Sequence, residues 1–435
     1  MSEVRREEPQ TSRLSSIIFL RPAPGAESWQ AMKETSSLVL AAVTLSATLV
    51  ALLGCSPVGG ATTAASSIQA SGFISVSGKV ISRDGKPWIP HAFQQVAFVS
   101  PPGYTSADGA KQIFLTAAQS YTSAEYTQMV QQGADSVRIQ FAQTGIDPKG
   151  IYPSQTFTNN VIAAAKAARA AGLTVILSDQ DEAQTGETNE SGLPAGGAQG
   201  AWTNLLTTAP WIGQDTGILL EIYNEPFVGV TPEGPPPAAD WTQWQTAMNA
   251  LIATIRGTGA KNVLIADGLE HAEELTGALP LTDTVSPVIY ASHPYAHNYQ
   301  DQNAAGTDAN GNVVAGTGWN VMFGNFAATN PVMVTEWGNG YYCDNITGTA
   351  DVAFLQYLQG RGVGLVATTW DWAGPNFGSI RVNFPNSTVT SFPAAGTPIC
   401  HIDAQTGEAV IDDGVGPGQL VQTWFTTGTP SAVLE

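Results

Sequence analysis

Short apolar runs alternate with longer stretches of helical spacing along most of the chain. The apolar runs are rich in Val, Ile and Leu and end in polar or turn-forming residues, which is typical of strands buried on both faces. Strands are predicted at 92–98, 136–141, 174–177, 218–223, 262–266, 288–292, 332–335 and 363–369. Helices are predicted at 123–132, where Thr122 can cap the first turn, and at 159–171, 201–208, 240–257, 270–277, 319–328, 350–360 and 418–426. The alternation indicates an α/β fold.

Eight alternating strand–helix units favour a single (β/α)8 TIM barrel. A doubly wound sheet is the runner-up, but it would more often carry a glycine-rich phosphate loop, and the sequence has no such motif. The long connections follow strands rather than helices, at 100–117, 180–200, 226–239, 295–318 and 371–416. In a barrel these long βα loops all rise from the C-terminal face, where a cleft would be built.

The N-terminal region has the pattern of an export signal. Lys33 precedes an apolar run at 38–53, and the run ends in the tetrad LLGC at Cys55. A basic residue, an apolar segment and a small residue before a cut are typical of a signal peptide. The tetrad resembles the lipobox of bacterial lipoproteins, which implies lipidation of Cys55, whereas a plain signal peptide or a single membrane anchor stays open. Translation starts at Met1 or at Met32.

Three segments follow from this pattern. Residues 1–55 are predicted to be an extension with the signal segment, and 56–71 are rich in Gly, Ala, Ser and Thr, as flexible linkers are. Residues 72–435 then form one folded domain. It begins with a predicted β-hairpin at 73–90, where the pair Asp84-Gly85 separates two β-prone runs.

The composition narrows the possible partners and the compartment. A hydrophobic content of 43% with 12% charged residues suits a globular chain rather than a disordered one. A formal net charge of −19 makes the protein a poor binder of nucleic acid, because the phosphate backbone would repel it. If Cys55 is lipidated, Cys343 and Cys400 remain as an even pair in an oxidising compartment, and we predict a disulfide between them.

Two predicted strand ends carry a glutamate. The stretch GILLEIYNEPF ends in Asn224-Glu225-Pro226, and the stretch PVMVTEWG ends in Glu336-Trp337-Gly338. In a barrel both carboxyl groups would lie at the same mouth. Two neighbouring carboxyl groups push their pKa values apart, so one can donate a proton while the other, ionised, attacks. Such a pair of carboxyl groups suits the cleavage of a glycosidic bond.

These motifs resemble glycoside hydrolase family 5, the cellulase family of retaining (β/α)8-barrel enzymes. The resemblance runs from about residue 73 to the C-terminus and rests on the Asn-Glu-Pro motif and on the later Glu-Trp-Gly motif. It implies that Glu225 is the general acid/base and that Glu336 is the nucleophile. It also implies that Asn224 bonds the sugar 2-hydroxyl.

Other positions match the family pattern. The resemblance implies that Arg138 lies under the nucleophile and holds it ionised, that Tyr295 hydrogen-bonds the nucleophile, and that His293 orients the acid/base. It also implies that Trp370 stacks under the sugar at the cleavage site, and Trp372, two residues later, is the alternative for this role.

The end of the third strand departs from the family. A His is often found there, whereas this chain runs through Ser178-Asp179-Gln180-Asp181. By register Gln180 takes that place, with Asp179 as the alternative. A glutamine can bond a sugar hydroxyl, but it cannot titrate near neutrality. Glu221, within the preceding motif, is expected to be a buried structural carboxylate and not a catalyst.

The expected function is that of a retaining endo-β-1,4-glycanase. It would hydrolyse β-glucan such as cellulose by double displacement with its two glutamates, without a cofactor or a metal. β-Mannan or another β-glycan is the nearest alternative, and a barrel that binds glycans without catalysis is the alternative of another class. The expected partner is a polysaccharide, with membrane contact only through a lipid anchor. The protein is expected to be an exported monomer, either a surface or periplasmic lipoprotein or a secreted enzyme.

Overall fold

The computed structural model describes residues 72–104, 122–181, 192–228, 236–295, 317–338, 348–370, 400–402, 409–411 and 418–431. The predicted signal segment and linker lie outside this part, as do Cys55, Cys343 and Trp372, and of Cys400 only the backbone is described. The predictions of lipidation and of a disulfide therefore stay predictions. Within the described residues, every helix is too short or too polar to cross a membrane.

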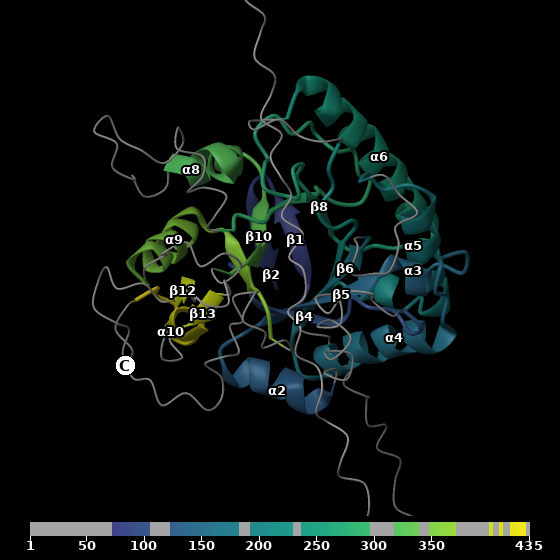
Figure 1. The fold of residues 1–435 in the computed structure, drawn as a ribbon, viewed down its shortest axis with the longest axis horizontal. Helices are drawn as coiled ribbons and strands as arrows, with labels where there is room; N and C mark the ends of the chain where they lie inside the picture. The colour runs from purple at the N-terminus through teal and green to yellow at the C-terminus, as the bar shows by residue number, and fades with distance from the viewer. Residues whose placement is uncertain are drawn as a thin grey trace, which may run out of the picture. The chain divides into compact units, whose positions relative to one another are not determined.

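Eight parallel strands close into a barrel (Figure 1). They are β4 (His91–Phe98), β5 (Ser136–Ala142), β6 (Thr174–Gln180), β7 (Ile218–Glu221), β8 (Leu264–Asp267), β9 (Ile289–Ser292), β10 (Val332–Trp337) and β11 (Gly364–Ala367). Each strand pairs with the next one along the chain, and β11 pairs with β4 to close the ring. The predicted (β/α)8 TIM barrel is confirmed, and the doubly wound sheet is excluded.

Helices surround the barrel (Figure 1). The longer ones are α2 (Ser123–Gln131), α4 (Gln155–Ala170), α5 (Gly196–Thr208), α6 (Ala238–Gly257), α9 (Gly348–Arg361) and α10 (Gly418–Thr427). The side chain of Thr122 accepts the backbone N–H of Glu125 and caps α2, as predicted, and Ser154 caps α4 in the same way. Short turns complete the set: α3 (Gln143–Ile146), η3 (Ile212–Gln214), α8 (Thr317–Trp319), η4 (Asn320–Gly324) and η5 (Phe326–Ala328).

The prediction of a helix at 270–277 is wrong. The three consecutive residues 270–272 have φ angles of 56°, 54° and 62°. This left-handed conformation is incompatible with a right-handed helix. An antiparallel bridge joins Leu269 to Glu274, so the segment folds back on itself as a loop. The predicted helix at 319–328 is present as a helical segment of mixed type, in which the α-helical turn α8 is followed by the π-helical η4 and the 3-10 helix η5.

The N-terminal hairpin closes one end of the barrel. The predicted hairpin around Asp84-Gly85 is present as β2 (Val80–Arg83) and β3 (Lys86–Pro87), and a further strand, β1 (Ile74–Ser77), pairs antiparallel with β2. Asp84 and Gly85 both have positive φ, as a two-residue hairpin turn requires. Ile74 and Ile81 pack in one buried cluster with inward-facing residues of the barrel strands. The backbone N–H of Ile74 donates to the carbonyl of Thr216, just before β7, so the hairpin covers the end where the strands begin.

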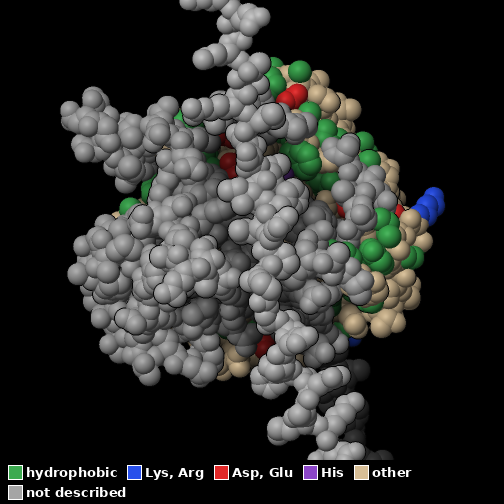
Figure 2. All heavy atoms as spheres, viewed as in Figure 1, with side chains coloured by type: hydrophobic (Ala, Val, Ile, Leu, Met, Phe, Trp, Pro, Cys, Tyr) green, Lys and Arg blue, Asp and Glu red, His purple; other side chains and the backbone are tan. Residues whose placement is uncertain are grey.

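Two small features complete the described part. β12 (Cys400–Ile402) and β13 (Ala409–Ile411) form a two-stranded antiparallel sheet. On the face shown in Figure 2, hydrophobic side chains are scattered among backbone and other side-chain atoms, and few charged atoms lie among the described ones.

Candidate active site

The ends of the barrel strands bring the polar side chains together around Arg138 of β5. Its Nε donates to the carboxylate of Glu221 at the end of β7, and its NH1 group donates to the carboxylate of Glu336 in β10. Its NH2 group donates to Oγ of Ser178 at 2.9 Å and to Oδ1 of Asn224 at 2.6 Å. Burial lowers the pKa of Arg138, but the charges of Glu221 and Glu336 outweigh it, so the net shift is upward. Arg138 is a permanent buried cation between two carboxylates.

The two oxygens of Glu336 have different surroundings. Oε1 accepts hydrogen bonds from Arg138, from Nε2 of Gln94 at 2.9 Å and from Nε2 of Gln140 at 3.3 Å. Oε2 accepts the hydroxyl of Tyr295 at 2.6 Å. Burial raises the pKa of Glu336, but the charge of Arg138 leads the opposing interactions and brings the pKa below its ordinary value. Glu336 is therefore an ionised carboxylate at neutral pH.

Glu225 lies just beyond β7 in a left-handed backbone conformation, with φ of 49°. Its backbone N–H donates to Oδ2 of Asp267 at 3.1 Å, and its Oε1 lies 2.8 Å from Nδ1 of His293. The other ring nitrogen of His293, Nε2, lies 2.9 Å from Oγ1 of Thr335. Contacts on both sides of the ring thus fix the imidazole against the Glu225 carboxyl group.

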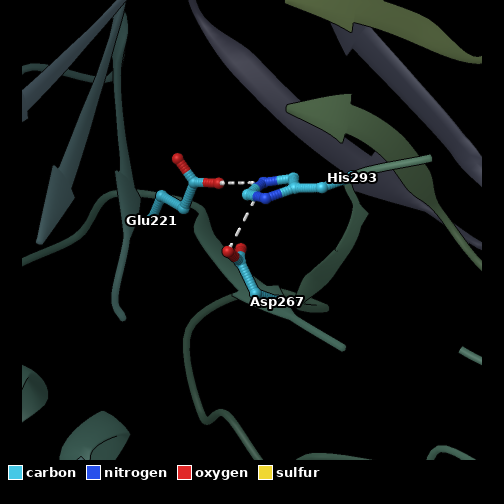
Figure 3. Close-up of side chains that lie close together, drawn as sticks. All are labelled: Glu221, Asp267 and His293. Carbon is cyan, nitrogen blue, oxygen red and sulfur yellow. Dashed lines mark ion pairs between the residues drawn. The ribbon is translucent and has the colours of Figure 1, made fainter. Parts of the chain in front are cut away.

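Behind Glu225 lies a cluster of fully buried side chains, Glu221, Asp267 and His293 (Figure 3). Nε2 of His293 is 3.9 Å from Oε1 of Glu221 and 3.6 Å from Oδ2 of Asp267. Burial raises the pKa of Glu221, but the charge of Arg138 outweighs it and the pKa is lowered. Burial and the charge of Glu221 raise the pKa of Asp267 well above its ordinary value. Glu221 is thus the ionised carboxyl group of the cluster.

The side chains of the two motif glutamates are more exposed to solvent than the charged side chains around them. The side chains of Glu225 and Glu336 are 16% and 9% exposed, whereas those of Arg138, Glu221 and His293 are completely buried. Only the first two can meet a substrate. Glu221 is buried, as predicted, and its structural role stays a prediction.

Two groups of side chains have donor atoms close enough for a metal ion: Glu221, Asp267 and His293, and Glu225, His293 and Glu336, each within 4.8 Å. Arg138 already binds both Glu221 and Glu336. A second cation beside this guanidinium would be repelled, because the electrostatic interaction is strong in a buried site. The donor set therefore suits proton transfer better than metal binding.

The structure brings together most of the side chains that the sequence singled out. Asn224, Glu225, His293, Tyr295 and Glu336 lie in one hydrogen-bonded group with Arg138. Oε1 of Gln180 accepts Nε2 of Gln140 at 2.5 Å, and Ser178, two residues earlier, contacts Arg138. Alternation along β6 therefore places Gln180, rather than Asp179, on the active-site side.

Trp370 follows β11 and is buried, with 2% of its surface exposed. Its Nε1 donates to Oε2 of Glu125 on α2 at 2.6 Å, and its ring lies 5.0 Å from that of Phe93. Its backbone N–H donates to the carbonyl of Gln94 in β4 at 2.7 Å. These contacts hold Trp370 next to β4, whose residue Gln94 donates a hydrogen bond to Glu336. Trp372, its alternative, lies outside the described residues.

Three residues at the site were not predicted from the sequence: Gln94, Gln140 and Asp267. Gln94 lies in the middle of β4 beside a second glutamine, Gln95, and Gln140 lies two residues after Arg138, on the same face. Asp267 is the last residue of β8. In each case the available signal was a polar residue within a barrel strand, at a position that the period of two can place inside the barrel.

A parallel barrel with two glutamates, an arginine and a histidine at its C-terminal end is the arrangement of a barrel glycosidase. The family model described as cellulase, glycosyl hydrolase family 5, matches residues 104–376, more than half of the chain. The chain belongs to glycosyl hydrolase family 5 and is a glycosyl hydrolase. No curated protein sequence matches the chain significantly.

Solved structures share the fold at low sequence identity. A β-glucanase from Saccharophagus degradans in complex with cellotetraose is 18% identical, with 70% of this chain and 86% of that chain covered and a TM-score of 0.52. The catalytic domain of an endoglucanase from Thermobifida fusca in complex with cellotetraose is 17% identical, with 82% and 98% covered and a TM-score of 0.52. A family 5 cellulase from an Icelandic hot spring isolate is 16% identical, with 84% and 96% covered and a TM-score of 0.50.

Proposed function

We propose that this glycosyl hydrolase is a retaining endo-β-1,4-glycanase that acts on β-glucan such as cellulose. The distance between the two reactive groups carries the proposal. A carboxylate oxygen of Glu225 lies within 4.8 Å of one of Glu336. Carboxyl groups about 5 to 5.5 Å apart are typical of retaining glycosidases, whereas inverting enzymes keep about 6.5 to 9.5 Å to admit a water molecule. The short distance supports direct attack by one glutamate.

In the first step, Oε2 of Glu336 attacks the anomeric carbon while Glu225 gives its proton to the leaving glycosidic oxygen. The bond from the anomeric carbon to this oxygen breaks, and an ester bond to Glu336 forms. Oε2 is the better placed oxygen, because Oε1 is already the acceptor for Arg138, Gln94 and Gln140. These donors would hold the carboxylate still during the attack.

In the second step, Glu225 takes a proton from a water molecule, and the resulting hydroxide attacks the anomeric carbon. The ester bond to Oε2 of Glu336 breaks, and the free carboxylate is restored with Oε1 still bound by Arg138. His293, 2.8 Å from Glu225, would keep the acid/base carboxyl in place through both proton transfers. The hydroxyl of Tyr295 would stabilise the carboxylate of Glu336 whenever it is free.

The remaining polar residues are assigned to the sugar. Arg138 donates to Oδ1 of Asn224 and thereby fixes the orientation of the amide. We therefore assign the amide nitrogen of Asn224, Nδ2, to the sugar 2-hydroxyl. Gln180 takes the subsite position at the end of the third barrel strand, and Trp370, or Trp372, provides the aromatic surface under the ring. The choice of β-glucan is supported by the two similar glucanase structures, which hold cellotetraose.

The activity test uses the full-length chain on carboxymethyl-cellulose, mixed-linkage glucan, xyloglucan and galactomannan, with reducing ends as the measurement. We expect release from the glucans, and release mainly from galactomannan would change the substrate to β-mannan and keep the mechanism. Glu336→Ala should abolish activity and keep glycan binding, whereas Asp240→Ala on the outer helix α6 is the control. No release from any substrate would favour a non-catalytic binding barrel.

Stereochemistry tests the mechanism separately. NMR of the first product should show the β-anomer, because two displacements retain the configuration. Initial formation of the α-anomer would contradict the double displacement. With Glu225→Ala, aryl glycosides with acidic leaving groups should lose less rate than natural glycans, since they need no proton. Equal losses on both substrates would remove Glu225 from the acid role.

We also propose that the protein is exported and lipid-anchored through Cys55, and that Cys343 and Cys400 form a disulfide. The tetrad LLGC after an apolar run and the remaining even pair of cysteines support this. The mass of the mature protein, measured with and without reductant, checks both statements. A mass that includes residues before Cys55, or a mass that reductant leaves unchanged, would contradict the corresponding part.

A further inference from the structure

Asp267 occupies a central position that neither motif includes. It ends β8, between the strand that precedes Glu225 and the strand that precedes His293. Its side chain is completely buried, so it cannot touch a substrate. Oδ2 accepts the backbone N–H of Glu225 at 3.1 Å and lies 3.6 Å from Nε2 of His293. Asp267 therefore contacts the acid/base through its backbone rather than through its reactive group.

Two buried oxygens in this cluster lack a hydrogen-bond donor among the described residues: Oδ1 of Asp267 and Oε1 of Glu221. The two carboxyl groups approach within 4.8 Å. Buried oxygens almost always have a hydrogen-bond partner, and two carboxyl groups this close do not both ionise. A proton on one of the two groups removes the repulsion and gives that group a hydrogen to donate.

The charged neighbours decide which group holds the proton. Nε of Arg138 binds Glu221 directly, which keeps Glu221 ionised. Asp267 instead faces the negative charge of Glu221 and lacks an ion pair with Arg138. The charged or titratable groups around it are Glu221 on β7, His293 after β9, Arg138 on β5 and Glu225 in the loop after β7. The proton therefore belongs to Asp267.

We propose that Asp267 is a positioning residue for the acid/base, a neutral carboxylic acid that donates its proton to Glu221 and accepts the backbone N–H of Glu225. This inference rests on the proposed role of Glu225. The upward pKa of Asp267, caused by burial and by the charge of Glu221, agrees with it. A left-handed conformation is strained for a non-glycine residue such as Glu225. The bond from Glu225 to Asp267 offsets that strain and aims the carboxyl group at His293.

The test compares Asp267→Asn with Asp267→Ala in the full-length chain. Asparagine has the shape of the neutral acid, with a carbonyl oxygen for Glu225 and an NH2 group for Glu221. We expect it to keep kcat within about threefold and to leave the pH profile unchanged, because a mimic of the neutral acid removes no charge. Alanine should lower kcat on natural glycans by on the order of 10- to 100-fold with little change in KM, since a misplaced general acid loses part of its effect.

Two further measurements identify the mechanism. Aryl glycosides with acidic leaving groups should lose less rate in Asp267→Ala than glycans do, because Asp267 acts through Glu225. The infrared absorption of protonated carboxyl groups at neutral pH should decrease by the contribution of one carboxyl group in Asp267→Asn. Asp283→Asn is the matched control, because Asp283 is a buried aspartate paired with Arg256 outside this cluster, and it should leave kcat unchanged.

Other results would overturn the inference. If Asp267→Asn loses as much kcat as Asp267→Ala, or shifts the pH profile, Asp267 acts as an anion and the inference is wrong. If Asp267→Ala does not fold, the activity, pH profile and infrared spectrum of Asp267→Asn still decide. Failure of the proposed function looks different: the wild-type protein would release no sugar, or Glu225→Ala would stay active on glycans.

Discussion

Glu274, in the loop after β8, offers a quantitative test of this structure. Its side chain is 3% exposed, and Oε2 lacks a hydrogen-bond donor among the described residues. Burial, together with the charges of Glu273 and Glu270, raises the pKa of Glu274 from 4.5 to about 8. The same loop supplies the carbonyl of Ala272 to the backbone N–H of His293 at 2.8 Å. Ionisation of Glu274 would therefore act on a loop that supports the active site.

The sign and size of the effect follow from proton linkage. Between the unfolded pKa of 4.5 and the folded pKa of about 8, the folded protein binds more protons at Glu274 than the unfolded chain does. Its contribution to stability is thus fully present below pH 4.5 and is lost as the pH rises towards 8. Since each pKa unit corresponds to about 1.4 kcal/mol, the total loss is about 5 kcal/mol.

Urea unfolding of the wild type and of Glu274→Gln at several pH values measures this loss, because glutamine cannot ionise. We expect the two free energies of unfolding to agree within about 1 kcal/mol near pH 5, and the variant to be more stable by about 3 kcal/mol at pH 7 and about 5 kcal/mol at pH 9. Glu270→Gln, in the same loop, should produce a smaller change. A difference that is constant with pH would refute the reasoning, since it would show that Glu274 does not titrate abnormally.

Three substitutions test the network around Glu336. Tyr295→Phe removes a hydrogen bond that lowers the pKa of Glu336, so the acidic limb of kcat/KM should move up by about one pH unit, and an unmoved limb would contradict the contact. Arg138→Met leaves Glu221 and Glu336 as uncompensated buried charges and should cost about 3 to 5 kcal/mol in chemical denaturation, whereas near-native stability would show that the carboxyl groups take up protons instead. Gln94→Leu removes a donor 2.9 Å from Glu336 and should lower kcat about tenfold in steady-state assays, whereas an unchanged kcat would assign Gln94 to packing alone.

Residues at the ends of strong strand patterns were predictable from the sequence. Glu225 and Glu336 follow continuous apolar runs, and a barrel brings such ends together whatever the loops between them do. Arg138 was predicted from the family resemblance, and Gln180 from its register at the end of the third strand. Register matters there because the side-chain period of a strand is two, so an error of one residue would turn the side chain away from the barrel interior. The contacts of Gln180 with Gln140 confirm that register.

The loop at 270–277 shows where this logic fails. Its Leu, Ala and Glu residues favour a helix, but contacts with distant residues decide its conformation: Gly268 donates to the carbonyl of Ala291, and His293 donates to that of Ala272. Local propensity is a weak signal that tertiary contacts override. Asp267 was missed for a related reason, because its neighbours Glu221 and His293 are brought to it only by strand pairing.

Arg138 links the buried cluster to the reactive groups, because it pairs with the buried Glu221 and with Glu336. One guanidinium binds two carboxylates, and the two differ in what a substrate can reach: Glu221 is sealed, whereas Glu336 keeps 9% of its surface exposed. Because Glu221 is ionised, the third carboxyl group, that of Asp267, has to stay neutral, and a neutral Asp267 leaves the field around Glu225 less negative. The arrangement thus supports an ionised Glu336 and a well-positioned Glu225 at the same time. Removing a charge anywhere in the cluster should change both reactive groups, which is why the pH profile is the most informative measurement on every variant.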